Sequence, residues 1–139
     1  MKRILFSHFN HEDYLGYKKS FHDISTEFTV SNVETGEKLF NLLRFYAPDL
    51  LIMDISSRSN DATSCLQRLI SEDKFRSLKI IIHSDAGQDA FKKDFQFSNN
   101  YYHLVKPFTG EQLRRTVEDA LSADWILAGE GSLEMVNGQ

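Results

Sequence analysis

Three side chains that together suit a phosphoryl group stand at the ends of three apolar runs. Asp54 ends the run Leu-Leu-Ile-Met, Ser84 follows Ile-Ile-Ile-His, and Lys106 follows the short segment at residues 101–105. A carboxylate can attack a phosphoryl group and become an acyl phosphate, while a hydroxyl and an ammonium group can each bind a phosphate oxygen. A lone aspartate at such a place can also simply cap the loop that follows it. The prediction of a phosphoryl-accepting site therefore depends on the three residues meeting.

The strands that must bring these residues together are visible as apolar runs. Runs typical of strands covered on both faces occur at residues 4–6, 50–53 and 80–82. Weaker strand patterns occur at residues 27–33 and 101–105. We therefore expect five strands.

Residues at helical spacing follow each of these strands. Asn10 is placed to cap the first helix, and Thr109 and Gln112 have the spacing of a capping box at the start of the last. The expected helices carry apolar pairs at Leu15 and Phe21, Leu39 and Leu43, Cys65 and Leu69, Phe91 and Phe95, and Leu113 and Val117. Five repeats of strand and helix predict an α/β fold, a five-stranded parallel sheet with helices on both faces. Ligands of such a sheet bind beyond the carboxyl ends of its strands.

The chain resembles the receiver domains of two-component response regulators over roughly residues 2–121. The resemblance rests on residues 48–55 (Pro-Asp-Leu-Leu-Ile-Met-Asp-Ile), on Ser84, and on Lys-Pro-Phe at residues 106–108. It implies the flavodoxin-like receiver fold with strand order 2-1-3-4-5. It also implies a histidine kinase or phosphotransfer protein as the partner that supplies the phosphate.

The resemblance assigns a role to each candidate residue. Asp54 matches the phospho-acceptor, Ser84 the switch hydroxyl, and Lys106 the lysine that contacts the phosphate. His103, three residues before Lys106, stands where the family usually has a switching aromatic residue. An imidazole can rotate as such a switch, and its charge can respond near neutral pH.

The residues after the first strand depart from the family's pattern. Receivers usually carry two adjacent acidic residues there, which hold Mg²⁺, and this chain has His8 and Phe9 in their place. Mg²⁺ wants oxygen ligands in near-octahedral geometry, so only Asp54 and the backbone carbonyl of Ser56 would remain. We expect Mg²⁺ binding to be weak or absent.

Three hypotheses of function follow. The first is an atypical receiver that acts through protein–protein contacts, with phosphorylation of Asp54 weak or lost. The second is a working phospho-acceptor in which Glu12 or Asp13 helps to hold the metal. The third is an unrelated small α/β binding protein or enzyme, disfavoured because the glycine-rich phosphate loop, the nucleophile elbow and the dinucleotide fingerprint are missing. We expect no enzyme activity beyond self-catalysed phosphoryl transfer to Asp54.

Two other features carry alternatives. His8, Asp54 and His103 could lie near one edge of the sheet and bind zinc, although packed or surface histidines explain them as well. Cys65 is expected in the core, and His83 is expected to turn away from whatever Ser84 faces.

Aromatic residues gather around the expected fourth helix and fifth strand, where receivers commonly pair. A homodimer through this surface is therefore an expectation. The aromatic residues are Phe91, Phe95, Phe97, Tyr101 and Tyr102.

The composition favours one globular domain. The chain has 139 residues, 41% of them hydrophobic and 26% charged, with a formal net charge of −4 and one cysteine. This balance offers no electrostatic footprint for nucleic acid or an anionic membrane, and one cysteine permits no internal disulfide. We expect a cytoplasmic receiver-like domain at residues 1–127 and a tail or linker start at residues 128–139.

Overall fold

The structure, a computed structural model, describes residues 2–24, 28–56, 60–84, 101–105 and 109–122. Its strands are β1 (Lys2–Ser7), β2 (Phe28–Val33), β3 (Leu50–Asp54), β4 (Ile80–Ser84) and β5 (Tyr101–Val105). Its helices are α1 (His11–Ile24), α2 (Gly36–Leu43), α3 (Asn60–Ser71) and α4 (Gly110–Ser122), with a 3-10 helix at Asp73–Phe75. The helix expected around Phe91 and Phe95, Lys106, and the tail expected at residues 128–139 lie outside the described residues.

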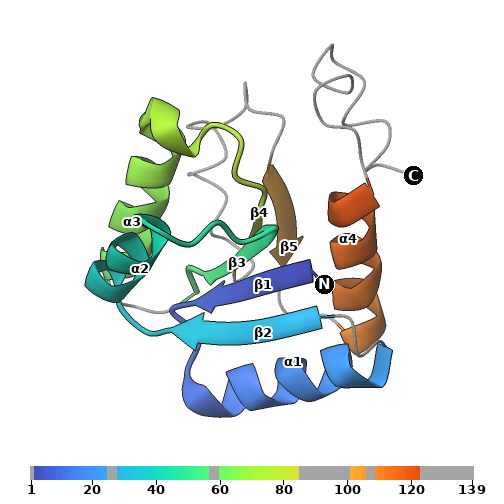
Figure 1. Ribbon diagram of the computed structural model, residues 1–139. Coiled ribbons are helices and arrows are strands. Elements are labelled where there is room, and N and C mark those ends of the chain that lie inside the picture. Colours follow the sequence, from blue (N-terminus) through green and yellow to red (C-terminus); the bar gives the residue numbers. More distant parts are fainter. Residues whose placement is uncertain (1, 25–27, 57–59, 85–100, 106–108, 123–139) are drawn as a thin grey trace.

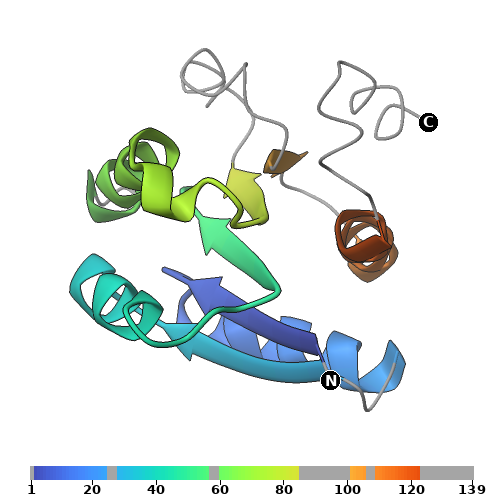
Figure 2. The same cartoon turned by 45° about the horizontal axis from the view of Figure 1, so that its top comes forward.

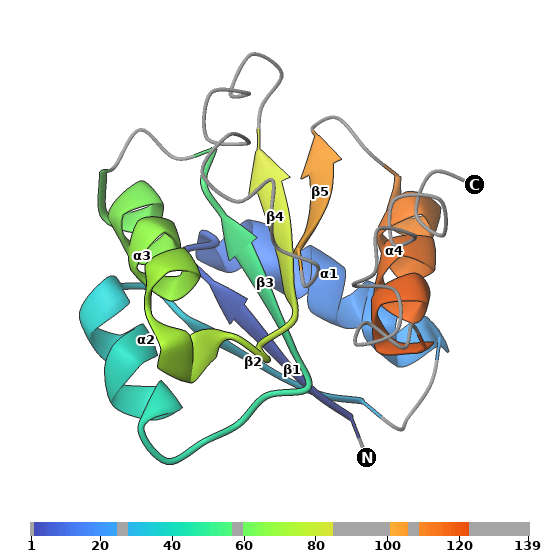
Figure 3. The same ribbon diagram turned by 90° about the horizontal axis from the view of Figure 1, so that it is seen from above.

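The five strands form one sheet in the order β2-β1-β3-β4-β5, and every neighbouring pair is parallel. This confirms the predicted fold class and strand order. Figure 3 shows β3, β4 and β5 pointing toward the same edge of the sheet. Because the strands are parallel, the side chains that follow their carboxyl ends gather at that edge.

Helices cover both faces of the sheet (Figures 1 and 2). Two sets of buried side chains fill the two interfaces, and the alternation of each strand sends its residues in turn to one set or the other. The α1 and α4 face buries Ile4, Phe6, Phe9, Tyr14, Phe21, Leu50, Ile52, Ile81, Tyr102, Leu113, Val117 and Ala120. The α2 and α3 face buries Leu5, Leu39, Leu51, Met53, Ile55, Ala62, Cys65, Leu66, Leu69, Ile80 and Ile82.

The buried face of α1 differs from the prediction in one residue. Phe21 is buried as expected, but Leu15 is 46% exposed and Tyr14 takes its place in the core. The reason is helical geometry: Tyr14 and Phe21 are seven residues apart, nearly two full turns, whereas six residues carry Leu15 well around the helix. The pairing of Leu15 with Phe21 was therefore wrong.

Two predicted helix caps are present. The Asn10 side chain accepts a hydrogen bond from the Asp13 amide at 2.8 Å. Thr109 Oγ1 accepts one from the Gln112 amide at 3.0 Å, and Gln112 Oε1 accepts one from the Thr109 amide at 2.8 Å. Both devices satisfy amide groups that the first turn of a helix leaves unpaired, and they fix where α1 and α4 begin.

Candidate functional site

Asp54 lies at the carboxyl end of β3, and its side chain is 6% exposed. Its Oδ1 accepts hydrogen bonds from the Ser56 amide at 2.8 Å, the Ser56 hydroxyl at 2.5 Å and His83 Nδ1 at 3.1 Å. Burial opposes ionisation, but the hydrogen bonds from His83 and Ser56 together outweigh it and hold the pKa of Asp54 below its ordinary value. Asp54 is therefore an ionised and firmly held carboxylate at neutral pH.

His83 is a site residue that the sequence did not reveal. It pairs with Asp54 across the β3–β4 register, and its side chain is buried. Because a carboxylate can only accept, His83 Nδ1 carries the proton of this hydrogen bond. The Tyr17 hydroxyl lies 3.4 Å from Nε2. Tyr17, His83 and Asp54 thus form a hydrogen-bonded chain from the edge of α1 into the sheet.

The Tyr17 hydroxyl keeps its proton across the physiological range. Burial, followed by the charges of Asp13 and Asp54, raises the pKa of Tyr17 to about 12. A protonated phenol can either donate or accept, so it can pair with Nε2 while Nδ1 donates to Asp54. The carboxylate fixes the direction of the His83–Asp54 hydrogen bond.

The other predicted phosphate-binding residues are only partly described. Ser84 is fully buried at the end of β4, beside Val105 of β5 in the register. Strand alternation places Ser84 with Ile82 on the α2 and α3 face, and His83 on the opposite face, as predicted. The backbone of His103 pairs with Ile82, while its side chain and all of Lys106 lie outside the described residues.

Phe9 fills the space beside the Asp54–His83 pair. Its ring is buried. The centroid of this ring lies 5.1 Å from that of Phe6, 5.6 Å from that of Tyr17 and 5.0 Å from that of His83. A phenyl ring offers no ligand to a cation. The position at which the family resemblance implies an acidic residue is therefore occupied by apolar core.

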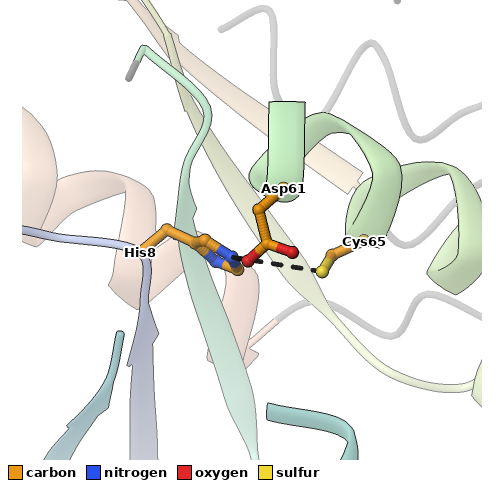
Figure 4. A group of neighbouring side chains, drawn as sticks. All are labelled: His8, Asp61 and Cys65. Atoms are coloured by element: carbon orange, nitrogen blue, oxygen red, sulfur yellow. Dashed lines mark hydrogen bonds and ion pairs between the residues drawn. The ribbon is translucent and has the colours of Figure 1, made fainter. Parts of the chain in front are cut away.

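His8 points to a different partner from the one considered in the sequence (Figure 4). Its Nε2 lies 2.8 Å from Asp61 Oδ2 on α3 and 4.0 Å from Cys65 Sγ. The zinc set considered as an alternative in the sequence joined His8 to Asp54 and His103. Within the described part of the chain, the donor atoms that gather around His8 come instead from Asp61 and Cys65.

A left-handed backbone at His8 accompanies this orientation. Its φ of 68° is the one positive value at a non-glycine residue among those described, and its amide donates to the Val33 carbonyl at 2.9 Å. Such a conformation is uncommon outside glycine, although histidine, asparagine and aspartate adopt it more readily than most. Sequence patterns carry no signal for it.

The two partners of His8 differ in their surroundings. Hydrogen bonds from His8 and from the Gly36 amide hold the pKa of Asp61 below its ordinary value. Burial, followed by the charge of Asp61, raises the pKa of Cys65 to about 11, so its sulfur is a protonated thiol near neutral pH. Cys65 lies in the core, as predicted.

Mg²⁺, the cation that the family resemblance implies beside Asp54, finds no oxygen ligand in the side chains of His8 and Phe9. His8 is bonded to Asp61, and Phe9 supplies no oxygen. Asp13 Oδ2 accepts a hydrogen bond from Asn10 Nδ2 at 3.0 Å within the helix cap. At residues 8 and 9 the described chain therefore offers no carboxylate oxygen to a hard cation, and Asp54 stands at this strand end without an adjacent acidic pair.

None of the described helices is both long enough and apolar enough to span a bilayer.

No protein-family model matches the sequence. Solved structures with this architecture include the receiver domain of a DNA-binding response regulator from Colwellia psychrerythraea, at 15% identity and a TM-score of 0.73, covering 88% of this chain and 100% of that one. The receiver domain of a sensor histidine kinase from Pseudomonas aeruginosa, solved with magnesium in its active-site cleft, is 16% identical, with a TM-score of 0.71 over 88% and 98% of the two chains. A response regulator receiver protein from Sinorhizobium medicae is 22% identical, with a TM-score of 0.69 over 88% and 95%. The chain has the fold of response regulator receiver domains.

Proposed function

We propose that this chain is an atypical receiver domain that signals through protein–protein contacts, with phosphorylation of Asp54 weak or lost. The observation that carries the proposal is the environment of the Asp54 carboxylate. His83 and Ser56 bind its Oδ1, and Phe9 packs on His83.

The chemistry of phosphoryl transfer supports this reading. An attacking carboxylate needs positive charge nearby to offset the charge of the incoming phosphoryl group. Receivers obtain it from a cation held by an acidic pair, which His8 and Phe9 replace. The hydrogen bonds from His83 and Ser56 also stabilise the carboxylate as an anion, and a stabilised anion is a weaker nucleophile.

The proposed partners follow from the fold. A histidine kinase or phosphotransfer protein would engage the edge that carries Asp54, and a second copy would pair through β5 and residues 85–100. The single thiol of Cys65 suits a reducing, cytoplasmic setting.

Light scattering on a size-exclusion column would measure whether two copies of the chain pair. A monomer at all concentrations would remove the homodimer from the proposal.

A second candidate function is a working phospho-acceptor. The favouring observation is that Asp54 stands at the carboxyl end of β3 with its pKa held low, so it is ionised at neutral pH. In this case a metal bound with help from Glu12, or a positive group contributed by the kinase, would offset the charge of the phosphoryl group.

One experiment separates the two. The chain is incubated with acetyl phosphate and Mg²⁺, and the adduct is read by intact mass, with Asp54→Asn as the blank. The proposal expects little or no adduct on the natural chain. It expects a clear gain in His8→Asp and in the double variant His8→Asp, Phe9→Asp, which restore oxygen ligands at these positions.

Folding of each variant is checked by circular dichroism before the assay. His8→Asp is the safer change, because aspartate tolerates the left-handed backbone at this position. An adduct on the natural chain that needs both Mg²⁺ and Asp54 would establish the working acceptor and overturn the proposal.

A further inference from the structure

We propose that His8, Asp61 and Cys65 form a binding site for Zn²⁺, on the α3 side of the sheet edge and separate from Asp54. Their donor atoms all lie within 4.8 Å of one another (Figure 4). Imidazole nitrogen, carboxylate oxygen and thiolate sulfur are the three donors from which protein zinc sites are built. This inference does not depend on the function proposed above: it shares His8 with that argument, but Asp54, Ser56 and His83 are not among its ligands.

The distances are close to those of a filled site. Donors around a tetrahedral zinc ion stand about 3.3 to 3.6 Å apart, given the usual zinc–ligand lengths. His8 Nε2 lies 2.8 Å from Asp61 Oδ2 and 4.0 Å from Cys65 Sγ, on either side of that range. The Asp61 side chain is 49% exposed, so it can turn to lengthen its distance from His8 Nε2 by about 0.5 Å, the difference from a filled site.

Neighbouring groups orient two of the three ligands. Ser7 Oγ is within hydrogen-bond distance of His8 Nδ1, and the Gly36 amide donates to Asp61 Oδ2 at 2.8 Å. When zinc takes Nε2, the ring proton moves to Nδ1, and the Ser7 hydroxyl can turn to accept it. Outer hydrogen bonds of this kind hold metal ligands in place in known sites.

Gly36 lets the backbone of α2 approach the cluster. A Cβ at this position would stand 2.3 Å from Cys65 Sγ and 3.1 Å from Asp61 Oδ1. Any larger residue would thus enter the space that the ligand atoms occupy. The close approach is what allows the Gly36 amide to reach Asp61.

The site is open to solvent on the side of Asp61, while His8 and Cys65 are largely buried. Asp61 and Cys65 both line an open cavity of about 1010 Å³ between α2 and α3, together with Gly36 and Phe40. Three protein ligands leave the fourth position of a tetrahedral ion for water. On binding, the S–H bond of Cys65 breaks, its proton leaves to solvent, and a sulfur–zinc bond forms.

The ligands come from two elements far apart in the sequence. His8 follows β1, while Asp61 and Cys65 lie on the first two turns of α3. A bound ion would join the start of α3 to the end of β1. Because ions that bind only the folded chain stabilise it, zinc should raise the melting temperature.

The test uses the whole untagged chain, stripped of metal and titrated with Co²⁺ and then Zn²⁺. Tetrahedral Co²⁺ gives visible absorption bands, and a thiolate ligand adds a sulfur-to-cobalt charge-transfer band. We expect one Co²⁺ per chain, a charge-transfer band that Zn²⁺ abolishes, and a zinc-dependent rise in melting temperature.

Variants of the ligands decide between a built site and loose binding. Cys65→Ser should lose the charge-transfer band, and Asp61→Asn should weaken Zn²⁺ binding at least tenfold, the scale on which ligand-shell changes act. Asp61→Asn changes an exposed side chain, so its fold is expected to survive. His11→Gln and Asp73→Asn, exposed residues of the same types, are the matched controls and should bind like the natural chain.

Two outcomes would overturn the proposal. One is Co²⁺ binding without a sulfur band in the folded natural chain. The other is equal Zn²⁺ affinity in Asp61→Asn and in the natural chain, which would mean that the His8–Asp61 contact is only a hydrogen bond.

Discussion

His83 stands directly opposite Asp54 in the parallel register of β3 and β4, with its Nδ1 3.1 Å from Oδ1 of the carboxylate. The His83 imidazole donates a hydrogen bond to the buried Asp54 carboxylate. It also connects Asp54 to the Tyr17 hydroxyl on α1. The His83 side chain therefore contributes both to the stability of the fold and to the ionised state of Asp54.

His83→Gln should destabilise the fold, and His83→Asn should do so less. Both changes shrink a buried ring, but an asparagine amide can take the place of Nδ1 and keep donating to Asp54, while the glutamine amide falls nearer Nε2. Leaving a buried acceptor short of a donor costs about 1–3 kcal/mol, and more when the acceptor is charged. Urea unfolding measures the free energy of each variant, and equal losses would mean that the Asp54 hydrogen bond contributes little.

Stability should fall on acidification in a way that depends on Asp54. Its pKa is lower in the folded chain than in the unfolded one, so its contribution is full above the unfolded pKa. That contribution is lost as the pH falls from the unfolded value through the lower, folded one, because the unfolded chain then binds more protons. Urea unfolding at a series of acidic pH values should give a shallower slope for Asp54→Asn, and coinciding slopes would contradict the direction of the shift.

Gly36→Ala should be destabilising although alanine favours helices. The new Cβ would stand 2.3 Å from Cys65 Sγ, and forcing an extra methyl group into a packed site costs about 1–3 kcal/mol. Gly16→Ala on α1 is the matched control, since a Cβ there meets nothing within 4 Å, and it should be neutral or stabilising by up to about 1 kcal/mol.

A double variant identifies the clash as the cause. Adding Cys65→Ala to Gly36→Ala removes the sulfur that the new methyl group meets. The pair should then be more stable than the sum of the single changes predicts, because residues in contact do not act additively. Strict additivity in urea unfolding would place the cost of Gly36→Ala elsewhere.

Phe9→Ala should be among the most damaging single changes in the chain. The ring is buried among Phe6, Tyr17 and His83, and removing such a ring costs about 3–5 kcal/mol. Phe45→Ala is the control, because that ring is 83% exposed, and it should change the free energy of unfolding by less than about 0.5 kcal/mol. Thermal melts of the two variants would show the difference, and similar melting temperatures would contradict the burial of Phe9.

Much of the fold was predictable because its signals are local. The apolar runs of β3 and β4 mark strands covered on both faces, and Asn10 and Thr109 cap helices through groups within three residues of themselves. The strand order came from the family resemblance and is confirmed. The choice of Leu15 for the core failed because six residues of helix carry it well around from Phe21, whereas Tyr14, seven residues before Phe21, stays on the same side.

The sequence by itself determined the alternation of strands and helices, the place of Asp54 at a strand end, and the absence of carboxylates at residues 8 and 9. Only the tertiary structure decided which side chains meet there. The register that sets His83 against Asp54, and the left-handed backbone that turns His8 toward Asp61, join residues 29 and 53 positions apart. Contacts at such separations depend on how whole elements pack, and this packing cannot be predicted from the local periodicity of the sequence.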